Sequence, residues 1–566
     1  MDVDASFEIL GGFGGLQTLN FLIFMLCGNI SSWHLMGVVF TTSMPDEYRC
    51  SLPPNGTSLR DGEGYIPEQC QLIYEDEAGG ENETMSCVYG WDYYSAHGET
   101  SVVDDLDLVC DRAILVGTVT SIYFGGILAG AYVAGQLSDI YGRRLVVFGS
   151  LIGLVATGVG LSFMWNFAGM LALRFIHGFF LPGTMFLVYI RLIEMLTPRN
   201  RLTGQLVFDM MWVVSIALLA PLAYALPNWR HLQLAISLCQ VPVIFLIWFS
   251  YESIRWLVQR GRVEEAEKIL QRIAKSKNIS HPGYFLLAQQ DPDLQNGNRL
   301  EKIKENSIEL ETKTTLEKDQ ELVNPQQEKS NLDNSNQRPP ASVKKRATII
   351  DLFKTRTLTI RALIVFYWWF ACNVVYYGFF INAANLVGNK YLNFFLISVT
   401  EAPAYIVNYL MMKRFGRRRP LIFVCVISGV TCVITGLVPS ETASGTDLTV
   451  VILVFAMLGK LFSTAAFDII FLMSAEVFPT VLRSAAFGAS AMVGKVGGMV
   501  APFIVYLNVI HNSIPMIVFG VLSLLAGLLV LPLPETSDRT LPETLDDGVK
   551  LTSKAGPRDE KSPADV

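Results

Sequence analysis

Two short sequences decide the fold: GQLSDIYGRR at residues 135–144 and KRFGRR at residues 413–418. Each joins two apolar stretches, one in each half of the chain. A second pair follows the same plan, with EMLTPRNR at residues 194–201 and EVFPTVLR at residues 476–483. Both place Glu and Arg seven positions apart with Pro between them. Two pairs at nearly one offset indicate an internal repeat, and parallel repeats of six helices are one known plan for a membrane protein.

The composition agrees with a membrane protein. The chain has 566 residues, 51% of them hydrophobic, and a mean hydropathy of +0.38. Soluble domains are about 45–50% apolar and carry more charge. Runs of about 20 apolar residues can cross a bilayer, and only helices can do so here because backbone groups in lipid must pair within their own segment. We expect twelve spans near residues 16–40, 113–137, 145–165, 168–192, 204–226, 231–250, 359–383, 390–412, 420–438, 447–471, 482–507 and 511–532.

Basic residues in short loops predict the orientation. They fall on alternate loops, all on one side, and include Arg143, Arg201, Arg417 and Arg483. Positive residues favour the cytoplasmic side. An even number of spans then places both termini in the cytoplasm, and we expect a multi-pass protein of the plasma membrane. The alternative is that these basic residues only set the topology and have no further role.

The predicted domains follow from the spans. Residues 1–250 form an N-terminal six-helix bundle that includes an extracellular loop at 41–112. Residues 251–357 form a cytoplasmic central loop, partly helical and partly disordered. A C-terminal six-helix bundle covers 358–532, and a cytoplasmic tail covers 533–566. The expected fold class is an all-α membrane protein whose two bundles are related by pseudo-two-fold symmetry.

The large outer loop carries the signs of an extracellular segment. It is acidic, and Asn55 and Asn82 begin glycosylation sequons. Four cysteines in this loop predict two disulfides, for which three pairings are possible. They are Cys50, Cys70, Cys87 and Cys110.

Several classes of function find no support in the sequence. There is no nucleotide-binding glycine loop, no zinc-ligand spacing and no credible catalytic triad. We therefore expect no enzyme, cofactor or metal. The basic clusters are short and lie against membrane segments, so the expected partner is the lipid bilayer rather than nucleic acid.

The motifs together resemble the organic cation, anion and carnitine transporters of the major facilitator superfamily. The resemblance covers almost the whole chain and rests on GFGGLQ at 12–17, DLVCD at 107–111, RFIHG at 174–178, NWRHLQL at 228–234, ESIRWL at 252–257 and LPET at 533–536 and 541–544. Tyr251 and Ile254 replace two prolines that are usual in this family. Sugar porters share several motifs but do not usually have the cysteine-bearing loop, so they rank lower.

The loop motifs predict a gate. Gly142 permits a tight turn between two helices, and Asp139 lies at a helix end where its carboxylate can reach basic groups. The resemblance implies that such pairs latch the two bundles in the outward-facing state. The alternative, held equally, is that these ion pairs are static structural contacts, because exposed pairs often contribute under about 1 kcal/mol to stability. The candidate gating residues are Gly135, Asp139, Gly142, Arg143, Arg174, Glu194, Arg201, Arg417, Glu476 and Arg483.

Charges inside the predicted spans point to a substrate site, because each costs about 2.5–3.5 kcal/mol or more at mid-bilayer. Glu401 and Lys495 lie in the middle of their segments, and Asp468 lies in the tenth segment. Lys460 and Asp209 lie nearer the ends of theirs, so we expect them to reach water and give them less weight.

The resemblance implies roles for these charges. Cation-selective relatives have an acid where this chain has Lys495, whereas the anion and carnitine branches have a base. We therefore expect a zwitterion such as carnitine or β-alanine, with Lys495 holding the carboxylate and Asp468 or Glu401 the amine. The alternative is a structural salt bridge between Asp468 and Lys495.

Two aromatic residues complete the predicted substrate site. Trp369 and Tyr376 lie two turns apart on one helix face and match family positions that pack on the substrate. An amine over such rings gains about 0.5–2 kcal/mol. The alternative is that both are core or lipid-facing residues.

Together these features predict a secondary transporter that carries a small organic ion by alternating access. A gradient of substrate, Na⁺, H⁺ or voltage would drive it. An organic cation is the second candidate substrate, and a non-transporting receptor on a transporter scaffold is the alternative of another class.

Overall fold

The computed structural model describes most of the predicted helical regions. Its described residues are 3–10, 14–52, 64–75, 83–95, 97–197, 200–277, 285–286, 352–383, 386, 388–439 and 447–536. The sequons at Asn55 and Asn82, most of the polar central loop and most of the tail lie outside these ranges. The chain divides into two compact units, the larger made of residues 23–193, 201–250 and 347–566.

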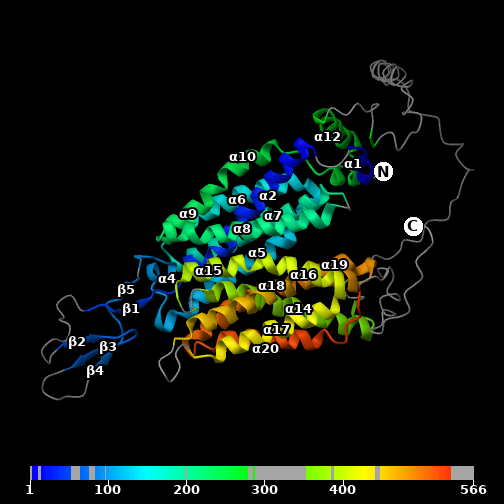
Figure 1. Cartoon of the computed structure of the whole chain (residues 1–566). Coiled ribbons are helices and arrows are strands. Elements are labelled where there is room, and N and C mark those ends of the chain that lie inside the picture. The colour runs from blue at the N-terminus through cyan, green and yellow to red at the C-terminus, as the bar shows by residue number, and fades with distance from the viewer. Residues whose placement is uncertain are drawn as a thin grey trace, which may run out of the picture. The chain divides into compact units, whose positions relative to one another are not determined.

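The larger unit holds two sets of helices, which Figure 1 shows on either side of a common interface. The N-half comprises α2 from Ile23 onward together with α3 and α5 to α10. The bounds are α2 (Gly15–Met36), α3 (Val38–Thr41), α5 (Ile114–Tyr141), α6 (Arg143–Ser162), α7 (Phe167–Glu194), α8 (Arg201–Ala225), α9 (Trp229–Cys239) and α10 (Val241–Phe249).

The C-half repeats this plan with the helices from α14 onward. Its bounds are α14 (Arg356–Asn382), α15 (Lys390–Val399), α16 (Glu401–Phe415), α17 (Arg418–Leu437), α18 (Thr449–Val477), α19 (Thr480–Tyr506), η7 (Leu507–Val509) and α20 (Ile514–Leu529). Among the described residues, eleven helices or helix pairs are long and apolar enough to cross a membrane, and α20 is a shorter apolar helix of 16 residues. The predicted twelve-helix membrane fold is confirmed.

Two of the spans are broken where proline removes a backbone donor. The sixth span divides at Gln240, and Pro242 lies in the first turn of α10. The eighth divides at Thr400, and Pro403 lies in the first turn of α16. Since proline has no N–H, the carbonyl four residues before it loses its helical partner. The second break places Glu401 at the start of a new helix.

Glycine turns link the second and third spans of each repeat. Gly142 has φ 102° and Gly416 has φ 83°, a region that side chains with a Cβ rarely adopt. Gly142 separates α5 from α6, and Gly416 lies between α16 and α17. The two motif glycines therefore occupy equivalent turns in the two halves.

A small domain of five strands caps one end of the helices, as Figure 1 shows beyond α9 and α15. β1 (Glu47–Cys50) pairs antiparallel with β5 (Trp91–Tyr94), and β2 (Gly64–Pro67), β3 (Leu72–Glu75) and β4 (Glu83–Met85) form a second sheet. The four cysteines pair as Cys50–Cys87 and Cys70–Cys110, one of the three possible patterns. We call this the disulfide end, and the opposite end, where Gly142 and Gly416 turn, the motif end.

The smaller unit comprises residues 1–22, 194–200 and 251–346. It contains α1 (Val3–Ile9), α11 (Ile254–Gln259) and α12 (Val263–Ser276). Phe7, Trp256 and Leu270 belong to its core. The buried Glu267 carboxylate accepts backbone hydrogen bonds from Phe285, at 2.7 Å, and from its neighbour Leu286, at 2.8 Å. One face of the charged helix α12 is therefore packed rather than solvated.

Candidate functional site

A fully buried ion pair lies between α16 and α18. Glu401 Oε1 is 2.8 Å from Lys460 Nζ, and both side chains are 0% exposed. The Lys460 ammonium also lies 3.6 Å from the ring centroid of Tyr376 and 4.1 Å from that of Phe380. A carboxylate and two ring faces compensate a charge that would be costly if buried alone. The expectation that Lys460 reaches water is wrong, because the Glu401 carboxylate and the two rings enclose its ammonium inside the bundle.

Asp468 lies two turns further along α18 and forms the next contact with α16. Asn408 Nδ2 donates a hydrogen bond to Asp468 Oδ2. Glu401 and Asn408 are themselves two turns apart on α16, so the two pairs form successive rungs between the helices. Thr464 lies between the rungs on α18, fully buried, and its hydroxyl finds no partner among the described residues. We call these five residues (Glu401, Asn408, Lys460, Thr464 and Asp468) the polar ladder.

Lys495 has a different environment. Its Nζ donates to the Tyr377 hydroxyl at 3.2 Å and lies 5.4 Å from that ring's centroid. The ring of Phe186, from α7 in the N-half, is 5.0 Å away. Within the described ranges no carboxylate forms an ion pair with Lys495. Asp468 and Lys495 thus bind Asn408 and Tyr377 respectively, and not one another.

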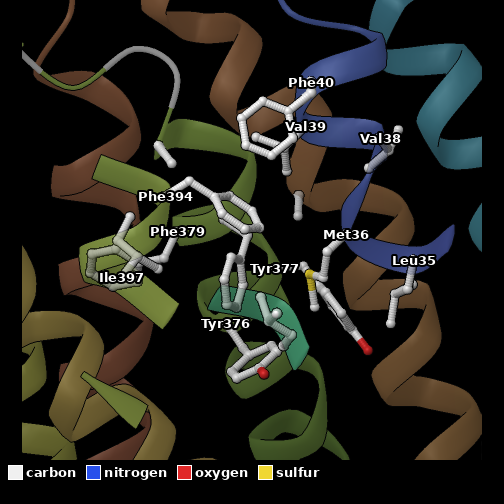
Figure 2. Packing of buried hydrophobic residues seen from close by; sticks show 14 of the residues in the cluster. Leu35, Met36, Val38, Val39, Phe40, Tyr376, Tyr377, Phe379, Phe394 and Ile397 are labelled. Carbon is white, nitrogen blue, oxygen red and sulfur yellow. The ribbon is translucent and has the colours of Figure 1, made fainter. Parts of the chain in front are cut away.

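The two lysines contact neighbouring tyrosines of α14. Figure 2 shows the neighbouring residues Tyr376 and Tyr377 of α14, whose rings pack edge to face with centroids 5.3 Å apart. Tyr376 faces Lys460, whereas Tyr377 faces Lys495 and packs edge to face on Phe124 of α5, with centroids 4.8 Å apart. Lys495 therefore lies where the two halves meet.

Small residues let α19 approach both halves. A Cβ on Gly497 would lie 2.5 Å from the Phe370 carbonyl of α14, and one on Gly498 would lie 2.7 Å from the Phe124 ring of α5. Lys495 is partly exposed in this glycine-rich stretch. Close helix packing thus leaves the lysine among backbone and rings rather than among larger side chains.

The predicted aromatic residues are more buried than a free binding surface requires. Trp369 is 2% exposed, donates from Nε1 to Ser474 at 2.9 Å and packs edge to face on Phe471 and Phe487. Tyr376 stacks on Phe467 with centroids 4.8 Å apart. In this state the Tyr376 ring lies against the buried Lys460 ammonium, and Trp369 packs within the C-half.

Asp209 of α8 is a further acid near these charges, and its position in the predicted span had suggested less weight. It is partly buried and lies within electrostatic range of Asp468 and Glu401, although it belongs to the other half. Tyr189 of α7 lies within range of both Asp209 and Asp468. The signal in the sequence was an acid in an apolar span, but only packing shows which helix it faces.

Aromatic rings hold the two halves together at the disulfide end. Phe40 of α3 stacks on Tyr391 with centroids 5.4 Å apart and tilts against Phe394 at 4.8 Å. Tyr224 of α8 packs edge to face on Tyr391 at 5.4 Å. Figure 2 shows Phe40 above Phe394 and the α14 tyrosines.

An ion pair reinforces this contact. Glu99, in the loop after β5, pairs with Lys390 at the start of α15, and their side chains are only 10% and 16% exposed. Below it, Ser121 of α5 donates to the Met499 carbonyl of α19 at 2.5 Å. These ring contacts, the ion pair and the Ser121 hydrogen bond lie in the parts of the helices nearest the disulfide end.

A cavity of about 100 Å³ opens beside these contacts. It lies among α3, α5, α14 and α19, and no predicted substrate residue lines it. Its lining includes Thr42, Val116, Thr120, Ile381, Pro502 and Tyr506.

At the motif end the loop residues contact their own half. Asp139 pairs with Arg143 at 2.6 Å, and its side chain is 61% exposed. In the C-half Arg417 lies 3.6 Å from Glu476, which also accepts from Thr536 at 2.5 Å. Glu476 thus pairs with Arg417, and among the described contacts it does not reach Arg483.

The other predicted gating residues hold local structure. Glu194 accepts from Ser253 at 2.6 Å, within the smaller unit. Arg201 begins α8, but its side chain lies outside the described part. Gly135 of α5 has open space where a Cβ would stand.

Arg174 is buried deep in the N-half rather than at the motif end. Its guanidinium donates to Thr41 at 3.0 Å, which joins α7 to α3. Beside it, His177 Nε2 lies 3.2 Å from His34 Nδ1, and His177 Nδ1 lies 2.9 Å from the Thr157 hydroxyl. This polar core fixes α7 against α2 and α6. No group of three His, Cys, Asp or Glu that could hold a metal occurs among the described residues.

Comparison with known sequences gives a consistent result. The model of the "Sugar (and other) transporter" family matches residues 66–283 and 302–545. The chain is 32% identical to an organic cation transporter protein of Drosophila melanogaster, over 99% of this chain and 96% of that protein. It is 30% identical to solute carrier family 22 member 3 of Mus musculus, over 97% of this chain and 96% of that protein.

Solved structures share the fold at low sequence identity. A D-xylose-proton symporter superposes with a TM-score of 0.55 at 14% identity, covering 93% of this chain and all of the other. A partially occluded inward open conformation of the xylose transporter XylE from E. coli gives 0.54 at 15% identity, covering 95% of this chain and 100% of the other.

Proposed function

This chain belongs to the organic cation transporter family, solute carrier family 22, within the major facilitator superfamily, and on that premise we propose that its substrate is a small zwitterion with an amine and a carboxylate. It is a secondary transporter and not an enzyme. Several relatives are named for organic cations, so the substrate class must be argued from this chain's own charges.

Lys495 carries the proposal. Its ammonium lies between rings from both halves, and a neutral hydroxyl is its hydrogen-bond partner. A charged donor in such surroundings gains most from a carboxylate, because charge-assisted hydrogen bonds are the stronger ones. An organic cation would meet repulsion at this point. The carboxylate of the substrate therefore binds Lys495.

Asp468 is the counter-charge for the amine. Glu401 is already compensated by Lys460, whereas Asp468 has one amide donor and remains partly exposed. Asp468 lies about 13 Å from the motif end of α18, and Lys495 about 22 Å from that end of α19, at 1.5 Å per residue. Side chains tilt toward the N-terminus of their helix, and the two helices run in opposite directions. The lysine and the aspartate therefore lean toward each other across this difference in depth.

The contacts between the halves support alternating access. The aromatic contacts of Phe40 and the Glu99–Lys390 pair close the disulfide end. The described ion pairs of the motif-end loops, Asp139–Arg143 and Arg417–Glu476, each lie within one half. We infer an inward-facing state, with the disulfide end outside the plasma membrane and both termini in the cytoplasm. In the outward-facing state the motif-end charges would exchange these partners for residues of the other half.

An organic cation is the second candidate, and the acidic residues Asp209 and Asp468 favour it. Three probes with one carbon skeleton separate the candidates: β-alanine, propionate and propylammonium. Uptake of each is measured in proteoliposomes with and without a sodium or proton gradient. We expect the fastest flux for β-alanine. Faster flux of propylammonium would favour the cation, and binding without flux of any probe would favour a receptor.

A further inference from the structure

We propose that Asp209 is a second acid of the amine subsite, so that the cationic group of the substrate is held between the two halves. This inference rests on the proposed function and names a residue of the same site. Asp209 comes from α8 of the N-half, whereas Asp468 and Asn408 come from the C-half. Both aspartates are partly exposed.

Asp209, Asp468 and Asn408 lie at similar distances from the motif end of their helices. Asp209 lies about 12 Å from the start of α8, Asp468 about 13 Å from the end of α18 and Asn408 about 10 Å from the end of α16, all counted from the motif end at 1.5 Å per residue. The electrostatic interaction of Asp209 with Asp468 agrees with this placement. Tyr189 interacts with both, and it lies one turn from Phe186, which contacts Lys495. The carboxylate and amine subsites are therefore adjacent.

Unpaired acceptors indicate a missing donor at this level. Asn408 is 0% exposed, and its amide nitrogen is used by Asp468, but its Oδ1 has no partner in the described part of the chain. The hydroxyl oxygen of Thr464, 1% exposed, is also without one. Buried acceptors of this kind are uncommon, because leaving one unpaired costs about 1–3 kcal/mol. An ammonium has three N–H donors, which suit Asp468, Asn408 Oδ1 and Asp209.

The arrangement also gives binding a mechanical consequence. Two carboxylates in opposite halves repel each other at close range, and the repulsion is strong where the surroundings have a low dielectric constant. A cation between them turns repulsion into two attractions. Binding of an amine would therefore draw α8 toward α16 and α18, and a substrate without the amine would lack this effect.

Asp209→Asn tests the inference, with Asp209→Glu as a second variant and the exposed Asp111→Asn as the control. The dissociation constants of β-alanine, propionate and propylammonium are measured for each purified protein. We expect Asp209→Asn to weaken both amines about tenfold or more and to leave propionate within about twofold, since one charged hydrogen bond is lost. Asp209→Glu should retain part of the affinity. Asp111→Asn should match wild type.

Three outcomes decide the matter. Equal loss for all three probes would show that Asp209 acts on the fold and not on the amine. Loss for β-alanine and propionate together with loss of a sodium effect would place an inorganic cation at this level instead. Unchanged amine affinity would overturn the inference alone, whereas a wild type that does not bind β-alanine would overturn the proposed function.

Discussion

Two lysines of the C-half contact neighbouring tyrosines of α14 but have different surroundings. Lys460 is 0% exposed and paired with a carboxylate that is itself fully buried. Lys495 is partly exposed, and its described partners are a hydroxyl and two rings. Burying a charge requires compensation, and Lys460 has a buried carboxylate at 2.8 Å, whereas Lys495 has none among the described residues. The first lysine therefore stabilises the bundle, and the second is available to a ligand.

The largest expected effect comes from breaking the buried pair. Glu401→Gln leaves the Lys460 ammonium without a counter-charge, and removing one partner of a buried pair costs about 3–5 kcal/mol. We expect a clear fall in the thermal unfolding temperature of the purified protein. Adding Lys460→Met should recover most of it, because both charges are then gone. If the double variant is as unstable as Glu401→Gln, the pair does not have the structural role assigned here.

A less buried pair should give an intermediate effect. Glu99 and Lys390 are 10% and 16% exposed and join the outer domain to α15. Glu99→Gln should cost about 1–3 kcal/mol and open the disulfide end, because a buried charged donor loses its partner. A cysteine at Thr42, which lines the cavity there, reports the opening. Labelling of Thr42→Cys by an impermeant thiol reagent should be faster with Glu99→Gln than without it, and equal rates would contradict the latch.

Removing the Tyr377 hydroxyl, which hydrogen-bonds Lys495, should have a smaller effect still. Tyr377→Phe removes the 3.2 Å hydrogen bond but keeps the ring. We expect a loss of about 0.5–1.5 kcal/mol in binding of a carboxylate substrate, or about 2- to 12-fold in its affinity. The free energy of unfolding should change by no more than this. A large fall in stability with unchanged affinity would mean that Lys495 is structural like Lys460.

A partly buried acid in the outer domain, Asp104, gives the smallest effect and a pH dependence. Burial is the main cause that raises the pKa of Asp104 to about 6. The folded state therefore binds the proton more tightly than the unfolded state, so this contribution is present at low pH and is lost as pH rises through about 6. Because the group is partly exposed, we expect under about 1 kcal/mol in stability. Asp104→Asn should flatten this part of the pH profile, and an unchanged profile would exclude Asp104 as its cause.

The sequence predicted the helices well because hydropathy and turn glycines act locally. The twelve spans and the turns at Gly142 and Gly416 follow from such local signals. The breaks at Gln240 and Thr400 also had a local cause in the nearby prolines, although the prediction did not use it.

The partners of the charges could not be predicted in the same way. Which side chain Glu401 meets depends on how α16 and α18 are rotated and how deep each enters the bundle. Lys460 and Asp209 received too little weight because hydropathy does not show which helix a charged side chain faces. The strand pairing of the outer domain and its disulfide pattern likewise depend on contacts between distant residues.

Uptake of β-alanine by proteoliposomes of wild type and Lys495→Ala, beside the exposed Lys275→Ala as control, tests the central assignment most directly. We predict that Lys495→Ala folds with wild-type stability, loses at least about 90% of β-alanine uptake and keeps or gains uptake of propylammonium. Equal loss of the amine and the zwitterion, or full retention of β-alanine uptake, would contradict the account.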